Sequence, residues 1–261
     1  MASPPIRHRS LPQHTDLPSS ADHGIRLEAV TLVRGAQRVF ESLTLALDEV
    51  RIGVIGDNGA GKSSLFRLVC GLDRPDAGRV RVHGCDTVAD RRGLSRQVGL
   101  MFQNPDDQII FPTVAEELAF SLTARGEPRA EARRQAHDFL ARRGLAAWAG
   151  RAVGELSQGQ RQQVCLLALL ISQPVTLLLD EPFASLDLPS QARLSAQLAA
   201  SGRQILVSTH MLSHVHDFER VLWLDQGAVR ADGPGREVCE AYAADVQRRA
   251  QAQRHGEAAH A

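Results

Sequence analysis

The chain has 261 residues, and its 43% hydrophobic and 23% charged residues are ordinary for a globular protein, which excludes wholesale disorder. The 30 Lys and Arg residues balance the 30 Asp and Glu residues, so we expect no role that depends on neutralising nucleic-acid phosphates. The longest apolar run, over residues 164–171, is far shorter than the roughly 20 residues that span a bilayer.

The two ends of the chain differ from the middle in composition. Residues 1–23 are rich in Pro, Ser and His and have no long apolar stretch, which predicts a disordered arm and no signal peptide. Residues 245–261 are rich in Ala, Gln, Arg and His, which predicts a polar tail that frays. The folded domain is therefore expected over residues 24–244. Its four cysteines form no CxxC pair, so neither a zinc site nor a disulfide framework is predicted, and a reducing compartment is expected.

Short aliphatic runs predict the centre of the domain. The runs at 52–55, 176–179 and 205–208 are typical of parallel strands that are buried on both faces. Residues 63–70 predict a helix, and Gly71 is placed to end it in the left-handed conformation. Strands that alternate with helices in this way indicate an α/β fold with a parallel sheet.

Two further segments predict smaller subdomains. The alternating sequence RVRVHG, at 79–84, indicates an antiparallel ribbon. From about Glu116 to Leu156 the chain is rich in Ala, Glu, Arg and Leu and has no strand pattern, which favours helices. The predicted fold is therefore an α/β core with an antiparallel β subdomain and a helical subdomain at about 104–157.

A glycine-rich loop follows the first aliphatic run. Its pattern, G-x-x-x-x-G-K-S, comprises Gly56, Asp57, Asn58, Gly59, Ala60, Gly61, Lys62 and Ser63, and Ser64 follows it. Between a strand and a helix, such a loop binds phosphates with its backbone N–H groups and the helix N-terminus. Lys62 is expected to reach the β- and γ-phosphates of a nucleotide, and the Ser63 hydroxyl to bind Mg²⁺. The alternative, a glycine-rich turn that closes a β–α unit, gives the Lys-Ser pair no packing purpose.

Two adjacent carboxylates, Asp180 and Glu181, follow the apolar run at 176–179. Ligands of an open α/β sheet bind at the carboxyl ends of its strands, so both carboxylates are expected beside the phosphates. Asp180 is predicted to hold Mg²⁺, usually through water. Glu181 is predicted to take a proton from, or to orient, the water that attacks the γ-phosphate. For Asp180 the alternative is a simple cap on the next element.

The segment LSQGQ, at 156–160, precedes an apolar helical stretch and then the Asp180 strand. With these residues the chain resembles the ATP-binding cassette (ABC) family, whose signature is LSGGQ; Gln158 stands at the second motif glycine. The resemblance implies a P-loop ATPase that uses ATP and Mg²⁺. It also implies that Ser157, Gly159 and Gln160 lie across from the phosphate loop of a second ATPase subunit, so that each ATP is held between two chains. Taken alone, Ser157 is also explained as a helix N-cap.

The other positions of the family follow in order over about residues 25–235. The resemblance implies that Gln103 senses Mg²⁺ and the attacking water, that residues 185–187 form the D-loop, and that His210 contacts the γ-phosphate. The implied catalytic set is Lys62, Gln103, Glu181 and His210, and the implied metal set is Ser63, Gln103 and Asp180. One position departs from the family. Arg34 stands where an aromatic side chain usually stacks on adenine, and its guanidinium plane can stack on a base instead.

The sequence FQNPDDQ, at 102–108, and the IIFPTVAEELAF that follows are similar to the ATPase subunits of energy-coupling-factor importers, which take up vitamins and transition-metal ions. This resemblance implies membrane partners (a scaffold and a substrate-binding subunit) and a peripheral place on the cytoplasmic face of the inner membrane. The second ATPase subunit is an identical chain or a paralogue. Residues 109–111 are expected to pack against a partner helix, provided that they are not core. No residue chooses between cobalt, nickel, biotin or another vitamin as cargo.

Two other functions remain open at this point. A soluble ABC ATPase acting on DNA or ribosomes usually has two cassettes or a long coiled-coil insert, and this chain has one cassette and a short helical insert. A phosphate-loop kinase needs an acceptor pocket and does not need LSQGQ. We therefore expect an importer ATPase without a nucleic-acid partner.

Overall fold

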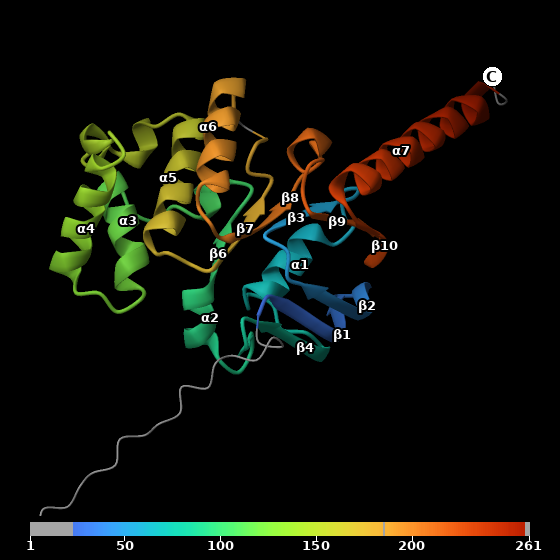
Figure 1. Cartoon of the computed structure of the whole chain (residues 1–261), viewed down its shortest axis with the longest axis horizontal. Coiled ribbons are helices and arrows are strands. Elements are labelled where there is room, and N and C mark those ends of the chain that lie inside the picture. Colours follow the sequence, from blue (N-terminus) through green and yellow to red (C-terminus); the bar gives the residue numbers. More distant parts are fainter. Residues whose placement is uncertain (1–22, 185, 259–261) are drawn as a thin grey trace, which may run out of the picture.

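The computed structural model describes residues 23–184 and 186–258, with backbone alone over 253–258. The predicted N-terminal arm lies outside the described residues except for residue 23, and so does residue 185 of the predicted D-loop. Two sheets lie on one side of the molecule, a group of helices lies on the other, and one long helix extends outward (Figure 1).

A six-stranded sheet forms the centre of the molecule, in the order β10-β9-β3-β8-β7-β6. All its neighbouring strands pair in parallel except β10, which pairs antiparallel with β9. The strands are β3 (Arg51–Ile55), β6 (Val98–Met101), β7 (Thr176–Asp180), β8 (Gln204–Ser208), β9 (Arg220–Asp225) and β10 (Ala228–Gly233). The aliphatic runs predicted as strands are β3, β7 and β8, and they are buried almost throughout because helices or the second sheet cover both faces. The predicted α/β fold is confirmed.

The second sheet is antiparallel and has the order β2-β1-β4-β5. Its strands are β1 (Ile25–Arg34), β2 (Gln37–Leu47), β4 (Ala77–Val82) and β5 (Cys85–Asp86). The predicted ribbon at 79–84 comprises most of β4 and the turn to β5, in which His83 and Gly84 both have positive φ. Helix α1 (Lys62–Val69) packs between the two sheets, with Leu65, Phe66 and Leu68 fully buried. Gly71 follows it with φ 71°, as predicted.

The helical subdomain is built from α3 (Val114–Thr123) and α4 (Arg129–Ala141). These two helices share a hydrophobic core with α5 (Gln158–Ile171), which contributes Val164, Leu167 and Ala168. Since α5 begins at Gln158, this core continues beyond the predicted boundary of 104–157. The remaining helices of the cassette are α2 (Arg91–Gln97) and α6 (Leu188–Ala199), with short 3₁₀ turns η2 (Pro105–Asp107), η3 (Ala146–Trp148), η4 (Val153–Glu155) and η5 (Leu212–His214).

Helix α7 (Gly235–Ala258) differs from the predicted polar tail, because it continues without a break through residue 245, where the tail was expected to begin. Asp245 is 5% exposed and pairs with Arg230 of β10 at 2.9 Å and with Arg249 at 2.9 Å. From Asp245 on, the polar sequence is therefore attached to the domain by ion pairs, whereas Val238 and Cys239 at the start of the helix are buried in a core cluster. Figure 1 shows the C-terminal half of α7 extending away from both sheets.

All four cysteines are free, and Cys165 and Cys239 are buried. Burial raises the pKa of Cys165 to about 12 and that of Cys70 to about 11, so both thiols are protonated and unreactive at neutral pH. Within the described part of the chain, no helix is both long and apolar enough to cross a membrane.

Candidate functional site

The phosphate loop lies between β3 and α1 and requires glycine at two of its positions. Gly56 has φ 143°, and a Cβ there would lie 2.1 Å from the carbonyl oxygen of Leu224 in β9. Gly61 has φ 108°, and a Cβ there would lie 2.9 Å from the ring of Phe40 in β2. Both sheets therefore pack closely against the loop, and only glycine fits at these contacts.

Lys62 begins α1 and turns back over the loop. Its Nζ donates hydrogen bonds to the carbonyl oxygens of Gly56 (2.8 Å) and Asp57 (3.1 Å). Burial lowers the pKa of Lys62, and the negative charges of Glu181, Asp180 and Asp57 oppose that shift. The structure thus brings the predicted lysine and the two predicted carboxylates into one electrostatic environment.

Glu181 and His210 meet at the carboxyl ends of β7 and β8. Glu181 is 8% exposed, and its backbone N–H donates to the carbonyl of Ser208 at 2.9 Å. It has φ 49°, a strained conformation for a residue that is not glycine. His210 Nδ1 lies 2.9 Å from Glu181 Oε2, although the contact lacks the angles of a hydrogen bond. Glu181 and His210, which lie 29 positions apart in the sequence, are therefore in contact.

The residues predicted to bind a metal supply oxygen atoms, namely the Ser63 hydroxyl, the Asp180 carboxylate and the Gln103 amide. Oxygen ligands of this kind suit Mg²⁺, so the donor set fits the ion. Ser63 follows Lys62 at the start of α1, and Asp180 ends β7, where its charge acts on Lys62. Gln103 is exposed after β6, and no hydrogen bond joins it to the phosphate loop within the described residues. Its part in the site stays a prediction.

Arg34 ends β1 and pairs with Asp73, which also binds Arg67 at 3.0 Å. Its neighbour Val33 is 40% exposed. Stacking of Arg34 on a base would exchange the contact with Asp73 for a contact with the ring. Its role in adenine binding stays a prediction.

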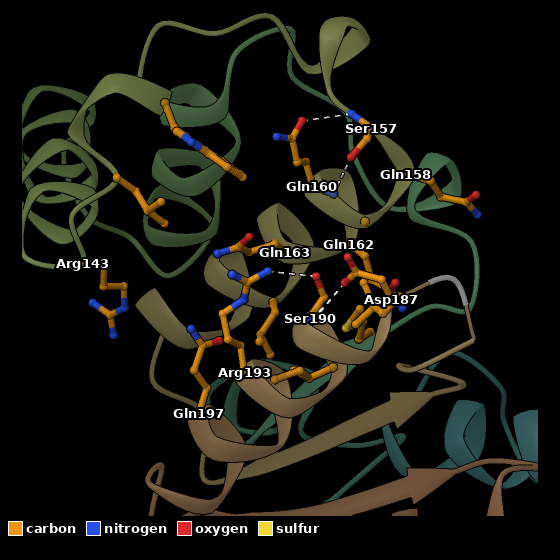
Figure 2. A pocket seen from close by; sticks show the side chains of 17 residues that line it. Arg143, Ser157, Gln158, Gln160, Gln162, Gln163, Asp187, Ser190, Arg193 and Gln197 are labelled. Carbon is orange, nitrogen blue, oxygen red and sulfur yellow. Dashed lines mark hydrogen bonds between the residues drawn. The ribbon is translucent and has the colours of Figure 1, made fainter.

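The signature turn stands at the N-terminus of α5. The Ser157 hydroxyl accepts a hydrogen bond from the Gln160 N–H at 3.3 Å, and the Gln160 side chain accepts one from the Ser157 N–H at 3.1 Å (Figure 2). This reciprocal pair is a capping box, so the alternative explanation of Ser157 as an N-cap describes a contact that is present. Gly159 packs close to Leu186, where a Cβ would lie 3.3 Å from the leucine side chain. Contact with a second subunit stays a prediction.

A cavity of about 870 Å³ opens beside this turn, between α5 and α6. Figure 2 shows Gln162, Gln163 and Arg193 among the side chains that line it. Gln162 is 3% exposed and donates a hydrogen bond to the carbonyl of Pro182 at 2.7 Å. The signature helix is therefore joined to the turn that follows Glu181.

Sequence reasoning missed two carboxylates that organise loops of the site. No role is predicted for Glu117, yet it is 5% exposed and accepts hydrogen bonds from the N–H groups of Ile110 and Phe111, both at 2.9 Å. Asp57 was considered only as part of the phosphate loop, and its side chain binds Tyr242 and Arg249 of α7. An acidic residue inside an apolar helical stretch was the available signal for Glu117. No sequence signal indicated the contact of Asp57.

Known proteins resemble this chain over most of its length. The profile of a family described as ABC transporter matches residues 41–184, which include the phosphate loop and Asp180. The biotin transport ATP-binding protein BioM of Rhodobacter capsulatus is 49% identical over 223 residues, which are 85% of this chain and 95% of that protein. The energy-coupling factor transporter ATP-binding protein EcfA of Methanothermobacter thermautotrophicus is 37% identical over 196 residues, which are 72% of this chain and 63% of that protein.

A solved structure shows the same arrangement of sheets and helices. The structure described as cbiO1 of Clostridium perfringens, part of the ABC transporter complex cbiONQ, superposes with a TM-score of 0.71. The sequence identity is 25%, and the match covers 83% of this chain and 90% of that one. The fold is therefore shared over nearly all of both chains.

Proposed function

The chain belongs to the ABC transporter family and is an ATPase of that family, and from this premise we propose that it is the ATP-hydrolysing subunit of an energy-coupling-factor type importer. The observation that supports the proposal best is the convergence of Lys62, Asp180 and Glu181 around one phosphate loop, with His210 beside Glu181. Relatives named for biotin transport and for energy-coupling factor transport support the importer class.

In the proposed reaction the phosphate loop binds the phosphates of ATP with its backbone N–H groups. Lys62 leaves the carbonyl oxygens of Gly56 and Asp57 and contacts the β- and γ-phosphates. Ser63 and Asp180, with Gln103, would hold Mg²⁺, which neutralises charge on the phosphates when it is bound. Because Lys62 Nζ is already held by two carbonyl groups of the phosphate loop, its movement onto a phosphate is a local rearrangement.

Glu181 is the proposed acceptor of the proton that the attacking water loses. Its position supports this role, because the carboxylate is 8% exposed at the end of β7 and is thus directed into the protein instead of bulk water. His210 lies 2.9 Å from the same carboxylate and is the proposed contact for the γ-phosphate. The products are ADP and inorganic phosphate.

The chemical step is tested with Glu181→Gln. The amide keeps the size of the side chain but cannot accept a proton, so turnover should fall by at least about 100-fold while Mg-ATP still binds. Hydrolysis is measured by phosphate release, binding by calorimetry, and assembly by size-exclusion chromatography with Mg-ATP, where a stable dimer is expected. Turnover within threefold of the wild-type rate would contradict the role of Glu181.

The partners proposed are integral membrane subunits on the cytoplasmic face and a second ATPase subunit. The segment after Gln103 supports a membrane partner, because Ile110 is 71% exposed while buried Glu117 fixes its backbone. Ile109 instead packs against two core clusters, and the Phe111 ring lies 5.0 Å from that of Phe120. The condition that residues 109–111 are not core therefore holds for Ile110 and fails for Ile109.

This surface is tested by Ile110→Asp in the assembled transporter. The change should abolish transport while the isolated chain keeps its ATPase activity, because an exposed side chain contributes little to folding. The matched variant Ile109→Asp should destabilise the isolated chain. Transport at the wild-type rate in Ile110→Asp would exclude this contact.

The proposed cargo is a vitamin or a transition-metal ion, and biotin is the first to test because relatives with 49% and 41% identity are named for biotin transport. None of the residues assigned above contacts the cargo, so the choice belongs to the membrane subunits. Uptake of labelled biotin, cobalt and nickel by cells that express the complete transporter, with Glu181→Gln as the inactive control, tests the assignment.

A further inference from the structure

The second residue of the phosphate loop is held by the C-terminal helix. The Asp57 carboxylate accepts hydrogen bonds from Tyr242 Oη at 2.8 Å and from the Arg249 guanidinium at 2.5 and 3.3 Å. A guanidinium that uses two nitrogens on one carboxylate is the strongest ordinary ion-pair geometry. Asp57 and Arg249 are each 46% exposed, so the pair stands at the protein surface.

The two residues of α7 that contact Asp57 lie on one face of the helix together with Asp245. Tyr242, Asp245 and Arg249 are spaced by three and four positions, which brings them above one another. Asp245 is buried and binds Arg249 Nε at 2.9 Å, whereas the two other guanidinium nitrogens bind Asp57. The Tyr242 ring packs edge-on against Trp223 of β9, with ring centres 5.2 Å apart. The guanidinium is therefore fixed between two carboxylates before any ligand binds.

The same residue of the loop also holds the lysine. The backbone carbonyl of Asp57 accepts from Lys62 Nζ at 3.1 Å, while its side chain binds α7. Arg249 and Tyr242 together lower the pKa of Asp57, so the carboxylate is ionised at neutral pH. A bare carboxylate at this place would repel the phosphates of a nucleotide, and Arg249 cancels that charge.

We propose that Arg249, assisted by Tyr242, is a positioning residue for nucleotide binding: it neutralises and fixes Asp57, so that α7 sets the affinity of the phosphate loop for Mg-nucleotide. The inference rests on the proposed function, since it requires that nucleotide phosphates bind at this loop. It assigns α7 a role in the ATPase site, although the helix contributes none of the family's motif residues.

The test measures Mg-ADP binding to the full chain by calorimetry, because ADP has the β-phosphate and is not hydrolysed. Arg249→Ala should raise the dissociation constant about fivefold to tenfold at low salt, and the effect should shrink at high salt as the charge of Asp57 is screened. Adding Asp57→Asn should restore affinity to within about twofold of wild type, because the charge that needed neutralising is gone. With ATP, KM should rise while kcat stays nearly constant.

Arg248→Ala is the matched control. Arg248 is adjacent in α7 and binds Asp245 at 3.1 Å without contacting Asp57, so its loss should leave the dissociation constant within twofold. Thermal unfolding of each variant reports any purely structural role. Lower stability with unchanged affinity in Arg249→Ala, or a double variant as weak as the single one, would overturn the inference.

The proposed function fails in a different way. Wild-type chain that does not bind Mg-ADP, or Lys62→Ala that binds it as tightly as wild type, would reject the nucleotide site itself. If wild type binds Mg-ADP and Lys62→Ala does not, the nucleotide site stands. An unchanged dissociation constant in Arg249→Ala then rejects only the role of α7.

Discussion

The phosphate loop and the signature turn each lie at the N-terminus of a helix, but they are stabilised in different ways. The loop packs closely against β9 at Gly56 and against β2 at Gly61, and Arg249 of α7 binds its Asp57. The signature turn is held by its own capping box, and Ser157 and Gln158 are exposed. The first site is thus preorganised by one chain. The second presents polar groups to solvent, as expected of a surface whose ligand arrives with another subunit.

This difference predicts that a change in the phosphate loop acts within its own chain. Lys62→Ala removes the only cation among the motif residues of the loop, so ATP hydrolysis should fall by about 1,000-fold or more. Phosphate release from the purified variant measures the effect. Activity within threefold of wild type would show that the loop is not the catalytic site.

The mixed dimer of Lys62→Ala and Ser157→Arg is the direct test of the two-chain arrangement. If each ATP is held between Lys62 of one chain and Ser157 of the other, one site of the mixed dimer has both defects and the other has neither. Mixing two inactive chains should then recover up to about half of the wild-type rate, given independent sites. The chains carry different affinity tags so that mixed dimers are isolated before the assay.

Mixed dimers that remain inactive would contradict a model in which each site is shared between two chains and turns over independently of the other. Dimers of each parent variant serve as the controls, because any activity in them would mean that one of the substitutions is not disabling. The test distinguishes the two regions of the molecule, since only the signature turn is expected to act on the other chain.

The sequence predicted those parts of the structure whose constraints are local. The phosphate loop follows from glycines and a Lys-Ser pair within a few positions, and β7 and β8 follow from continuous apolar runs. The link between Asp57 and Arg249 joins residues 192 positions apart, and no local pattern indicates it. Asp245 is predicted to lie in a polar tail because no local pattern indicates its partner, Arg230 of β10.

The roles at the signature turn could be predicted only through the resemblance to a family. In one chain Ser157 makes contacts that any N-cap makes, so neither its spacing nor its geometry distinguishes a cap from a ligand of a second subunit's nucleotide. The same holds for Gln103, which is exposed and has no hydrogen bond to the phosphate loop in the described residues. A role that depends on a bound nucleotide or on a second subunit is not defined by the contacts within one chain.

The smallest expected effect, on the stability of the chain, separates the two roles of Ser157. Ser157→Ala removes the cap and should lower the free energy of unfolding by about 1 kcal/mol, whereas Ser157→Asp keeps an oxygen for the Gln160 N–H and should leave stability nearly unchanged. ATPase activity should follow the opposite order. The carboxylate of Ser157→Asp would face the γ-phosphate across the dimer and should abolish turnover, while Ser157→Ala keeps the space and the helix N-terminus and should retain more of it. Urea unfolding and phosphate release measure the two effects. If activity simply followed stability, Ser157 would be a cap and nothing more.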